Sequence, residues 1–254
     1  MKARALAAQT RIELLLTLRR SESLLVTLAI PLGILVFFSK VDAVTDLAEP
    51  VDFLVPGVLA LAVMATAMVS LGIATGYERR YGVLKRLGST PLSRAGLLTA
   101  KTANVLLIEL VQAAVIVVVG IALGWSTSAR ILPAVVLLLV GTVAFAGIGL
   151  LMAGTLRAET NLALANALFL LLLFLGGMAY PLTRLPTALQ DIAEALPAAA
   201  LAEAVRDVLS PAHAFPLGHV LVLLTWAIAA RVFGFTSESA LAGPLAELLG
   251  GSSG

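Results

Sequence analysis

Polar and ionisable side chains inside hydrophobic stretches are the first candidates for chemistry in this sequence. Glu109 lies seven residues after Thr102, about 10 Å into a span that begins there. Gln112 follows one turn later on the same face, and Asn104 lies nearer the start. An ionisable group at that depth is costly and must face protein or water. Three interpretations of Asn104, Glu109 and Gln112 remain open: an interhelical hydrogen-bond patch, the lining of a translocation path, or a proton-coupling site.

Patterns that would carry out catalysis are weak. His213 and His219 have no carboxylate at ligand spacing and the chain has no cysteine, so neither a metal site nor a disulfide is predicted. The segment GLLTAKT, which starts at Gly96, lacks the second glycine of a phosphate-binding loop. Ser70 lacks the preceding glycine of a serine hydrolase nucleophile. We therefore predict no catalytic residue and no cofactor bound by this chain itself.

A basic polar segment, Tyr77–Lys101, separates two of the hydrophobic stretches. Its sequence is YERRYGVLKRLGSTPLSRAGLLTAK, in which six Lys/Arg residues are opposed by the single acid Glu78. Basic loops of membrane proteins remain on the cytosolic side. The segment is therefore expected to face the cytosol, where it can contact a soluble partner.

The composition places the chain in a lipid bilayer. Hydrophobic residues make up 60% of the sequence and charged residues 13%, with a mean hydropathy of +1.03, values far outside the range of soluble domains. The formal charge is only +2, and the basic residues cluster at the ends of the hydrophobic stretches, which argues against nucleic-acid binding. We predict a multi-pass protein of the plasma (inner) membrane, with lipids and no nucleic acid among its partners.

Six apolar stretches are expected to cross the bilayer, which predicts an all-α integral membrane protein. Crossing takes roughly 20 residues, so the first and last stretches would need tilt or local thinning of the bilayer. The predicted spans are Ser23–Ser39, Phe53–Tyr77, Thr102–Trp125, Ile131–Leu156, Leu162–Tyr180 and Leu217–Val232. Within them, the pairs Gly72/Gly76 and Gly120/Gly124 permit close approach of helices.

The N-terminal segment and the distribution of basic residues predict the orientation. Basic residues before the first span are spread too widely for a signal peptide, and Ile12, Leu15 and Leu16 form an apolar side, so we predict an amphipathic helix at the inner interface. With both termini in the cytosol, only four of the 17 basic residues face outward: Lys40, Arg130, Arg184 and Arg206. The opposite orientation would place the basic Tyr77–Lys101 segment outside, so both termini are predicted to be cytosolic.

The segment before the last span is expected to lie on the outer side. Leu189–Leu196 and Ala198–Leu209 have helical apolar spacing interrupted by Pro197, which predicts two short helices at or dipping into the outer interface. Such a cap is either packing or a gate over an exit path. After Phe233 the composition changes and the chain ends in a Gly/Ser run. We therefore divide the chain into a transmembrane domain, 1–233, and a tail, 234–254, which is either native or an added flexible linker.

Two blocks of sequence resemble the ABC-type-2 exporter permeases, and the likeness extends over Met1–Phe233. The first block, Pro56–Pro91, opens a span with Pro-Gly and leads into an arginine/glutamate-rich loop, a glycine, a leucine pair and Thr-Pro. The second, Phe174–Leu209, is similar to the exit from the family's fifth span. The matching residues are Pro56, Gly57, Glu78, Arg79, Gly82, Leu84, Leu87, Thr90 and Pro91, followed by Gly177, Pro181, Leu185, Pro186, Pro197 and Arg206.

The resemblance also shows where this sequence departs from the family. Members often have an acid where Arg80 stands, a threonine at Val83 and an acid at Lys85. These differences make the loop of this chain more basic. They affect the details of how such a loop would dock on a partner.

The resemblance implies a permease subunit that forms a homodimer or a heterodimer with a related second permease. It also implies two copies of a separate ABC ATP-binding subunit, which would bind ATP and Mg²⁺. A cytosolic coupling helix over Glu78–Thr90 would contact that partner, with Glu78, Arg79, Gly82, Leu84, Leu87, Thr90 and Pro91 as the coupling residues. The outer gate region would comprise Gly177, Pro181, Pro186, Pro197 and Arg206.

The function expected from this resemblance is ATP-driven export of a lipophilic or amphipathic substrate (a drug, an antibiotic or a lipid-like molecule) from the inner leaflet or cytosol. The short amphipathic start and the lack of a large outer domain in this sequence resemble antibiotic-resistance exporters more than polysaccharide exporters. Two other classes stay open. An ion-coupled secondary transporter would use Glu109 as its switch and show inverted repeats, whereas a membrane scaffold would have neither a path nor an ATPase partner.

Overall fold

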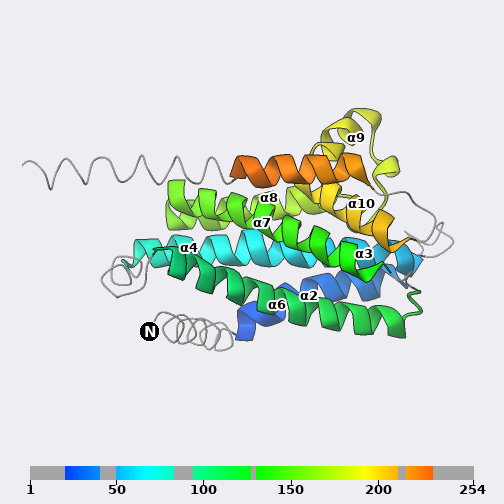
Figure 1. The fold of residues 1–254 in the computed structure, drawn as a ribbon, viewed down its shortest axis with the longest axis horizontal. Helices are drawn as coiled ribbons and strands as arrows, with labels where there is room; N and C mark the ends of the chain where they lie inside the picture. The colour runs from blue at the N-terminus through cyan, green and yellow to red at the C-terminus, as the bar shows by residue number, and fades with distance from the viewer. Residues whose placement is uncertain (1–20, 41–49, 83–93, 127–129, 211–215, 231–254) are drawn as a thin grey trace, which may run out of the picture.

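A computed structural model of the chain describes residues 21–40, 50–82, 94–126, 130–210 and 216–230. Within these ranges the regular structure is helical and contains no strand, which confirms the predicted all-α fold. Most helices run along one long axis and form an elongated bundle (Figure 1). The predicted amphipathic segment at the N-terminus and the 234–254 tail lie outside the described residues.

The helices follow the predicted spans closely. In chain order they are α2 (Ser21–Phe38), α3 (Pro50–Val63), the π-helix η1 (Met64–Ser70), α4 (Leu71–Arg80), α6 (Arg94–Ala122), α7 (Ile131–Thr155) and α8 (Ala158–Leu175). The short 3₁₀ helix η2 (Leu182–Arg184), α9 (Thr187–Glu194) and α10 (Pro197–Leu209) come next, before a final helix, Leu217–Ala230.

Four helical stretches of the described residues are long and apolar enough to cross a membrane. They are Pro50–Arg80, Lys101–Ala122, Ile131–Thr155 and Ala158–Leu175. Two shorter apolar helices, Thr27–Phe38 and Leu217–Ala230, lie where the first and last spans are predicted. α2 begins, and the final helix ends, toward the side of the bundle where α4 ends and α6 begins (Figure 1).

The continuous rod α3–η1–α4 occupies the centre of the bundle. In its most apolar window 89% of the residues are buried, against 28% in the corresponding windows of α6 and α8. Val58, Leu61, Met64 and Met68 are fully buried along this rod. The second predicted span is therefore the element around which the others pack, while α6 and α8 keep broad apolar faces on the outside, as expected for surfaces in contact with lipid.

α4 crosses α7 at two facing glycines. A Cβ atom added to Gly72 would lie 3.0 Å from the carbonyl oxygen of Gly149, and one added to Gly149 would meet the backbone of Met68. The predicted close approach at Gly72 is thus part of the internal packing of one chain. Its partner, Gly149, belongs to no small-residue pair that the sequence analysis recognised.

α10 is packed inside the bundle. The sequence predicted a helix over Ala198–Leu209 at or dipping into the outer interface, and did not predict that Ala198, Ala200, Leu201 and Val205 are fully buried. α10 packs against α3 and α7, and Leu201 occupies the space beside Gly141 of α7. The run of alanines allows this depth because small side chains let helix backbones approach closely. α9, by contrast, lies at the periphery (Figure 1).

The prediction of a single coupling helix over Glu78–Thr90 is wrong at its start. Glu78 and Arg79 belong to the last turn of α4, which ends at Arg80. Gly82 follows with a φ of +67°, a conformation that glycine adopts readily and that ends a right-handed helix. A helix that includes Glu78 is therefore interrupted at Gly82. Leu84, Leu87, Thr90 and Pro91 fall outside the described residues.

Candidate functional site

The last turn of α4 carries three consecutive charged residues that contact three different helices. Glu78 pairs with α6, Arg79 binds the end of α7, and Arg80 pairs with the start of α8. Successive residues point about 100° apart around a helix, so a helix enclosed by neighbours can present each residue to a different one. We call these three residues the α4 hub.

Glu78 and Lys101 form the most buried ion pair of the hub. Their carboxylate and ammonium groups are 2.6 Å apart, with side-chain exposures of 21% for Glu78 and 6% for Lys101. Their mutual attraction offsets part of the cost of removing both charges from water. Lys101 was counted in the sequence only as a basic residue of the cytosolic segment, since its proximity to Glu78 depends on how α4 and α6 pack.

Arg79 binds the C-terminal end of α7. Its guanidinium donates hydrogen bonds to the carbonyl oxygens of Gly154 and Leu156. The last carbonyls of a helix lack partners within it and carry partial negative charge, so a cation at this position is favourable. Arg79 therefore attaches the end of α4 to the end of α7.

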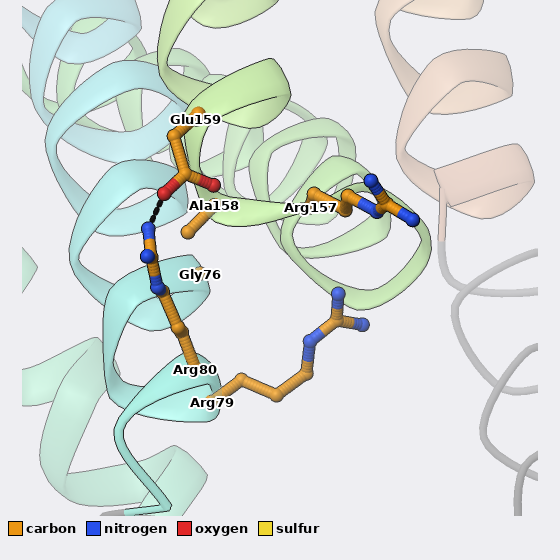
Figure 2. Close-up of a pocket in the computed structure, with 6 residues that line it drawn as sticks. All are labelled: Gly76, Arg79, Arg80, Arg157, Ala158 and Glu159. Carbon is orange, nitrogen blue, oxygen red and sulfur yellow. Dashed lines mark ion pairs between the residues drawn. The ribbon is translucent and has the colours of Figure 1, made fainter.

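Arg80 forms an ion pair with Glu159 in the first turn of α8, and Figure 2 shows the two side chains pointing at each other. Both are about half exposed, which makes this the weakest of the three contacts. Deeper along the same helix pair, the fully buried Asn161 donates from Nδ2 to the Gly72 carbonyl oxygen at 2.9 Å. Gly76 lies against the Asn161 amide, which leaves no room there for a larger residue.

A second polar cluster lies midway along the bundle. The Thr142 hydroxyl of α7 donates to Glu109 Oε2 at 2.6 Å, and the Thr66 hydroxyl of η1 donates to Gln112 Oε1 at 2.8 Å. Gln112 Nε2 also donates to the Thr27 carbonyl oxygen of α2 at 3.3 Å. Glu109 and Gln112 thus join α6 to α2, η1 and α7. Asn104 is half-buried on α6, one turn after Lys101.

The midway cluster includes a feature that the sequence did not reveal. Thr66 lies in the π-helix η1, whose wider turns change which side chains face α6. Such segments often mark functional positions in helices. The run MATAMVS carries no residue type that distinguishes a π-helix from an α-helix, so no signal in the sequence predicted it.

At the other end of the bundle, Arg206 of α10 gathers contacts from several elements. Its guanidinium donates to the carbonyl oxygen of Gly177 at 2.9 Å and to that of Phe53 at 3.4 Å, and it pairs with Glu203. The guanidinium carbon lies 3.7 Å from the centre of the Phe53 ring, a cation–π contact. We call this arrangement the Arg206 clamp.

The remaining predicted gate residues shape the turns around the clamp. Gly177 has a φ of +60° and makes the sharp turn that follows α8. Pro181 and Pro186 directly precede η2 and α9, and Pro197 is the first residue of α10, a position that proline tolerates because its missing N–H has no helical partner there. The sequence named these residues only as an outer gate region; among them, a hydrogen bond joins Arg206 to Gly177.

Further contacts join this end of the bundle, and none was predicted. Asp52 accepts hydrogen bonds from the backbone N–H and the hydroxyl of Ser126 at 3.1 and 3.2 Å. Trp226 of the final helix donates to the Ala195 carbonyl oxygen at 2.9 Å. The Tyr180 hydroxyl donates to the Phe174 carbonyl oxygen.

Comparison with known proteins identifies the family. A search of curated proteins finds no match. The family model described as "ABC-2 type transporter" matches residues 4–210, well over half of the chain and including the α4 hub, the midway cluster and the Arg206 clamp. Together with the apolar helices of a multi-pass membrane protein, this match shows that the chain belongs to the ABC-2 type transporter family, as a membrane-embedded permease subunit of an ABC transporter.

Proposed function

We propose that this chain exports a lipophilic or amphipathic substrate, driven by ATP that a separate ABC ATP-binding subunit hydrolyses. In this proposal residues 1–233 are the permease domain, cross the membrane six times and have both ends in the cytosol. The α4 hub then lies at the cytosolic end and the Arg206 clamp at the outer end. A second permease completes the transporter, and ATP and Mg²⁺ bind to the partner.

The observation that carries the proposal is the α4 hub. Two of the coupling residues implied by the family resemblance, Glu78 and Arg79, belong to the hub itself, and the hub holds α6, α7 and α8. A displacement of the hub by the partner would therefore act on four helices together. Transport requires that the two states of the permease bind the partner differently, because only then can ATP hydrolysis shift the equilibrium between them.

The outer surface of the bundle supports a substrate that enters from the lipid. Large apolar side chains are exposed along α6 and α8, with Leu110, Val118 and Phe174 each more than half exposed. These faces suit contact with lipid or with a second permease. A lipophilic molecule dissolved in the inner leaflet would reach them without crossing water.

The coupling role can be tested by placing charge in the segment after α4. We expect Leu84→Asp combined with Leu87→Asp to leave the protein inserted but unable to retain its ATPase partner or stimulate ATP hydrolysis. Both basic residues between them, Lys85 and Arg86, remain, and a desolvated carboxylate in an apolar contact is costly. Ser89→Asp adds a carboxylate to the same segment outside the leucine pair and serves as the control. Normal partner binding and export by the double variant would refute the coupling assignment.

The proposed orientation has an independent test. The chain contains no cysteine, so single cysteines introduced at Ser89 and Thr187 can be labelled selectively. We expect an impermeant thiol reagent to label Ser89→Cys only from the cytosolic side and Thr187→Cys only from the outside. Labelling of both from one side would contradict the orientation, without bearing on whether the chain is a permease.

A further inference from the structure

A pocket of about 370 Å³ opens beside the α4 hub, at the junction of α4 with the start of α8. It is lined by Gly76, Arg79, Arg80, Arg157, Ala158 and Glu159. Figure 2 shows that Arg80 turns toward Glu159, whereas Arg79 and Arg157 extend to the other side of the pocket. Six residues from two helices and the turn before α8 therefore surround one space.

The charges that line this pocket are unbalanced. Three arginines face one carboxylate, and that carboxylate is paired with Arg80. Arg79 donates to the carbonyl oxygens of Gly154 and Leu156, which use two of its five N–H donors and cancel no charge. Arg157 is exposed at the rim. The pocket thus has an excess of two positive charges, which favours an anion.

The start of α8 adds hydrogen-bond donors to the same pocket. Arg157 is the N-cap residue of α8, and its side chain makes no capping hydrogen bond. The first N–H groups of a helix have no partner within it and carry partial positive charge, which suits a phosphate. Gly76 has no side chain, so no atoms project into the pocket from this part of its lining. Arginine guanidinium groups bind phosphate through paired, charge-assisted hydrogen bonds.

The surroundings of the pocket indicate the source of the phosphate. Leu162 lies one turn after Glu159 on the same side of α8, and 37% of its surface is exposed. Leu164, two residues further along α8, is 45% exposed. An anion bound in the pocket would therefore have an apolar helix surface directly beside it. A phospholipid meets both requirements at once, with its phosphate in the pocket and its acyl chains along α8, whereas free phosphate uses only the first.

We infer that the pocket between α4 and α8 binds the phosphate of an anionic phospholipid, held by Arg79, Arg157 and the first N–H groups of α8. Arg80 and Glu159 close one side of the pocket. The bound lipid would cap α8 and offset part of the excess positive charge next to the hub. Lipid binding would then stabilise the junction of α4, α7 and α8. The inference requires only that this end of the bundle meets a membrane surface and is independent of ATP-driven export.

Native mass spectrometry of the purified full-length permease in detergent micelles tests this inference without any ATPase. The protein is titrated with dioleoyl phosphatidylglycerol or, separately, dioleoyl phosphatidylcholine, which share acyl chains and a phosphate but differ in net charge. We expect the first lipid to bind more tightly. Arg157→Gln should weaken its binding about tenfold, equivalent to about 1.4 kcal/mol. Arg157→Lys should recover only part of the loss, because lysine cannot form the paired contacts.

Lys40→Gln is the matched control, since it removes an exposed positive charge that follows α2 and is not part of the pocket lining, and it should leave lipid binding unchanged. Equal binding of phosphatidylglycerol by the parent and Arg157→Gln would overturn the inference. Displacement of the lipid by inorganic phosphate, but not by chloride at equal ionic strength, would identify a site for free phosphate and overturn the lipid assignment. Unchanged lipid binding by Arg157→Gln with loss of the ATPase partner would assign the pocket to that protein instead.

Discussion

The two ends of the bundle are held together in opposite ways. At the α4 hub, three consecutive side chains of one helix contact three separate helices, and the contacts range from the buried Glu78–Lys101 pair to the half-exposed Arg80–Glu159 pair. At the Arg206 clamp, one guanidinium with 14% exposure collects contacts from α3, the turn after α8 and its own helix. The contacts of the hub start from three side chains and reach three helices, whereas the contacts of the clamp all start from the single side chain of Arg206.

This difference suggests different roles in a transport cycle. Separate contacts join α4 to α6, α7 and α8. One of these contacts can therefore break while the other two remain. The clamp has a single centre, so its release would free α3, the turn after α8 and α10 together. The gate proposed at this end would have to exchange between two packed arrangements. Substitutions that remove single contacts at the two ends should therefore differ in size.

The largest effect is expected for Glu78→Gln. The variant removes the carboxylate 2.6 Å from Lys101, whose side chain is only 6% exposed, and leaves that charge in the bundle. Breaking a buried pair from one side costs about 3 kcal/mol. We expect the free energy of unfolding in detergent micelles to fall by about that amount. The double variant Glu78→Gln with Lys101→Met removes both charges and should recover most of the loss.

Arg80→Gln is the matched comparison within the hub. It breaks an ion pair whose two side chains are 50% and 58% exposed, and such pairs contribute less than about 1 kcal/mol. If Arg80→Gln lowers the unfolding free energy as much as Glu78→Gln does, the strength of the hub contacts does not depend on how buried they are. That result would contradict the distinction between the buried and the exposed ion pair of the hub.

Arg206→Lys should have the next largest effect. Lysine keeps the charge but cannot reach the carbonyl oxygens of Gly177 and Phe53 while it lies over the Phe53 ring. We expect a loss of about 2 kcal/mol in unfolding free energy, within the range for hydrogen bonds to charged groups. Lys40→Arg, at an exposed position just after α2, also keeps the charge; it is the control and should change the unfolding free energy by less than about 0.5 kcal/mol. Equal effects at the two positions would mean that charge alone matters at the clamp.

Gln112→Leu tests the contacts between the two ends. Leucine fills a similar volume but removes the hydrogen bonds to Thr66 and to the Thr27 carbonyl oxygen. Interhelical hydrogen bonds in membranes contribute about 0.6 kcal/mol on average. We expect a loss of about 1 kcal/mol for the two bonds together, measured by the same unfolding assay. A loss above that expected for Arg206→Lys would move the main structural constraint from the clamp to the midway cluster.

The sequence predicted where the helices lie better than it predicted which helices contact each other. Continuous apolar stretches locate the helices, closely for Ile131–Leu156 against the observed Ile131–Thr155, and less closely for Leu162–Tyr180 against the observed Ala158–Leu175. The periodicity of apolar residues could not predict that α10 is buried, because alanine is only weakly hydrophobic. The alanines of α10 allow burial because their small side chains let the helix pack closely against α3 and α7. The ends of helices were also less certain: one glycine, Gly82, separates α4 from the segment that resembles a coupling helix.

The candidate sites show the same division. Glu78, Arg79 and Arg206 were named from motifs, but their partners belong to helices far away in sequence and depend on the packing of the whole bundle. The polar residues within the spans were recognised because such groups are expensive in a membrane. Which helix each one contacts was not encoded locally. A motif can therefore identify a functional position, whereas the role of that position requires its neighbours.

The smallest effect is expected for Glu109→Gln, and it decides between two explanations of the midway cluster. The Thr142 hydroxyl has a single proton and two acceptors, Glu109 Oε2 at 2.6 Å and the Leu138 carbonyl oxygen at 3.0 Å. With glutamine at 109, Thr142 can donate to Leu138 and accept from the new amide, or donate to the amide oxygen. A purely structural patch would therefore tolerate the change in both stability and ATP-driven export.

Thr142→Val provides the contrast for this last prediction, because it leaves the Glu109 carboxylate without that donor and should cost more than Glu109→Gln. Export and unfolding are measured for both variants. An amide cannot release a proton, so export that stops in Glu109→Gln while insertion and partner binding remain normal would support the ion-coupled alternative. The opposite result is export that continues in Glu109→Gln and falls only as far as stability falls in Thr142→Val. It would support ATP hydrolysis by the partner as the energy source, acting through the α4 hub and its contacts with three helices.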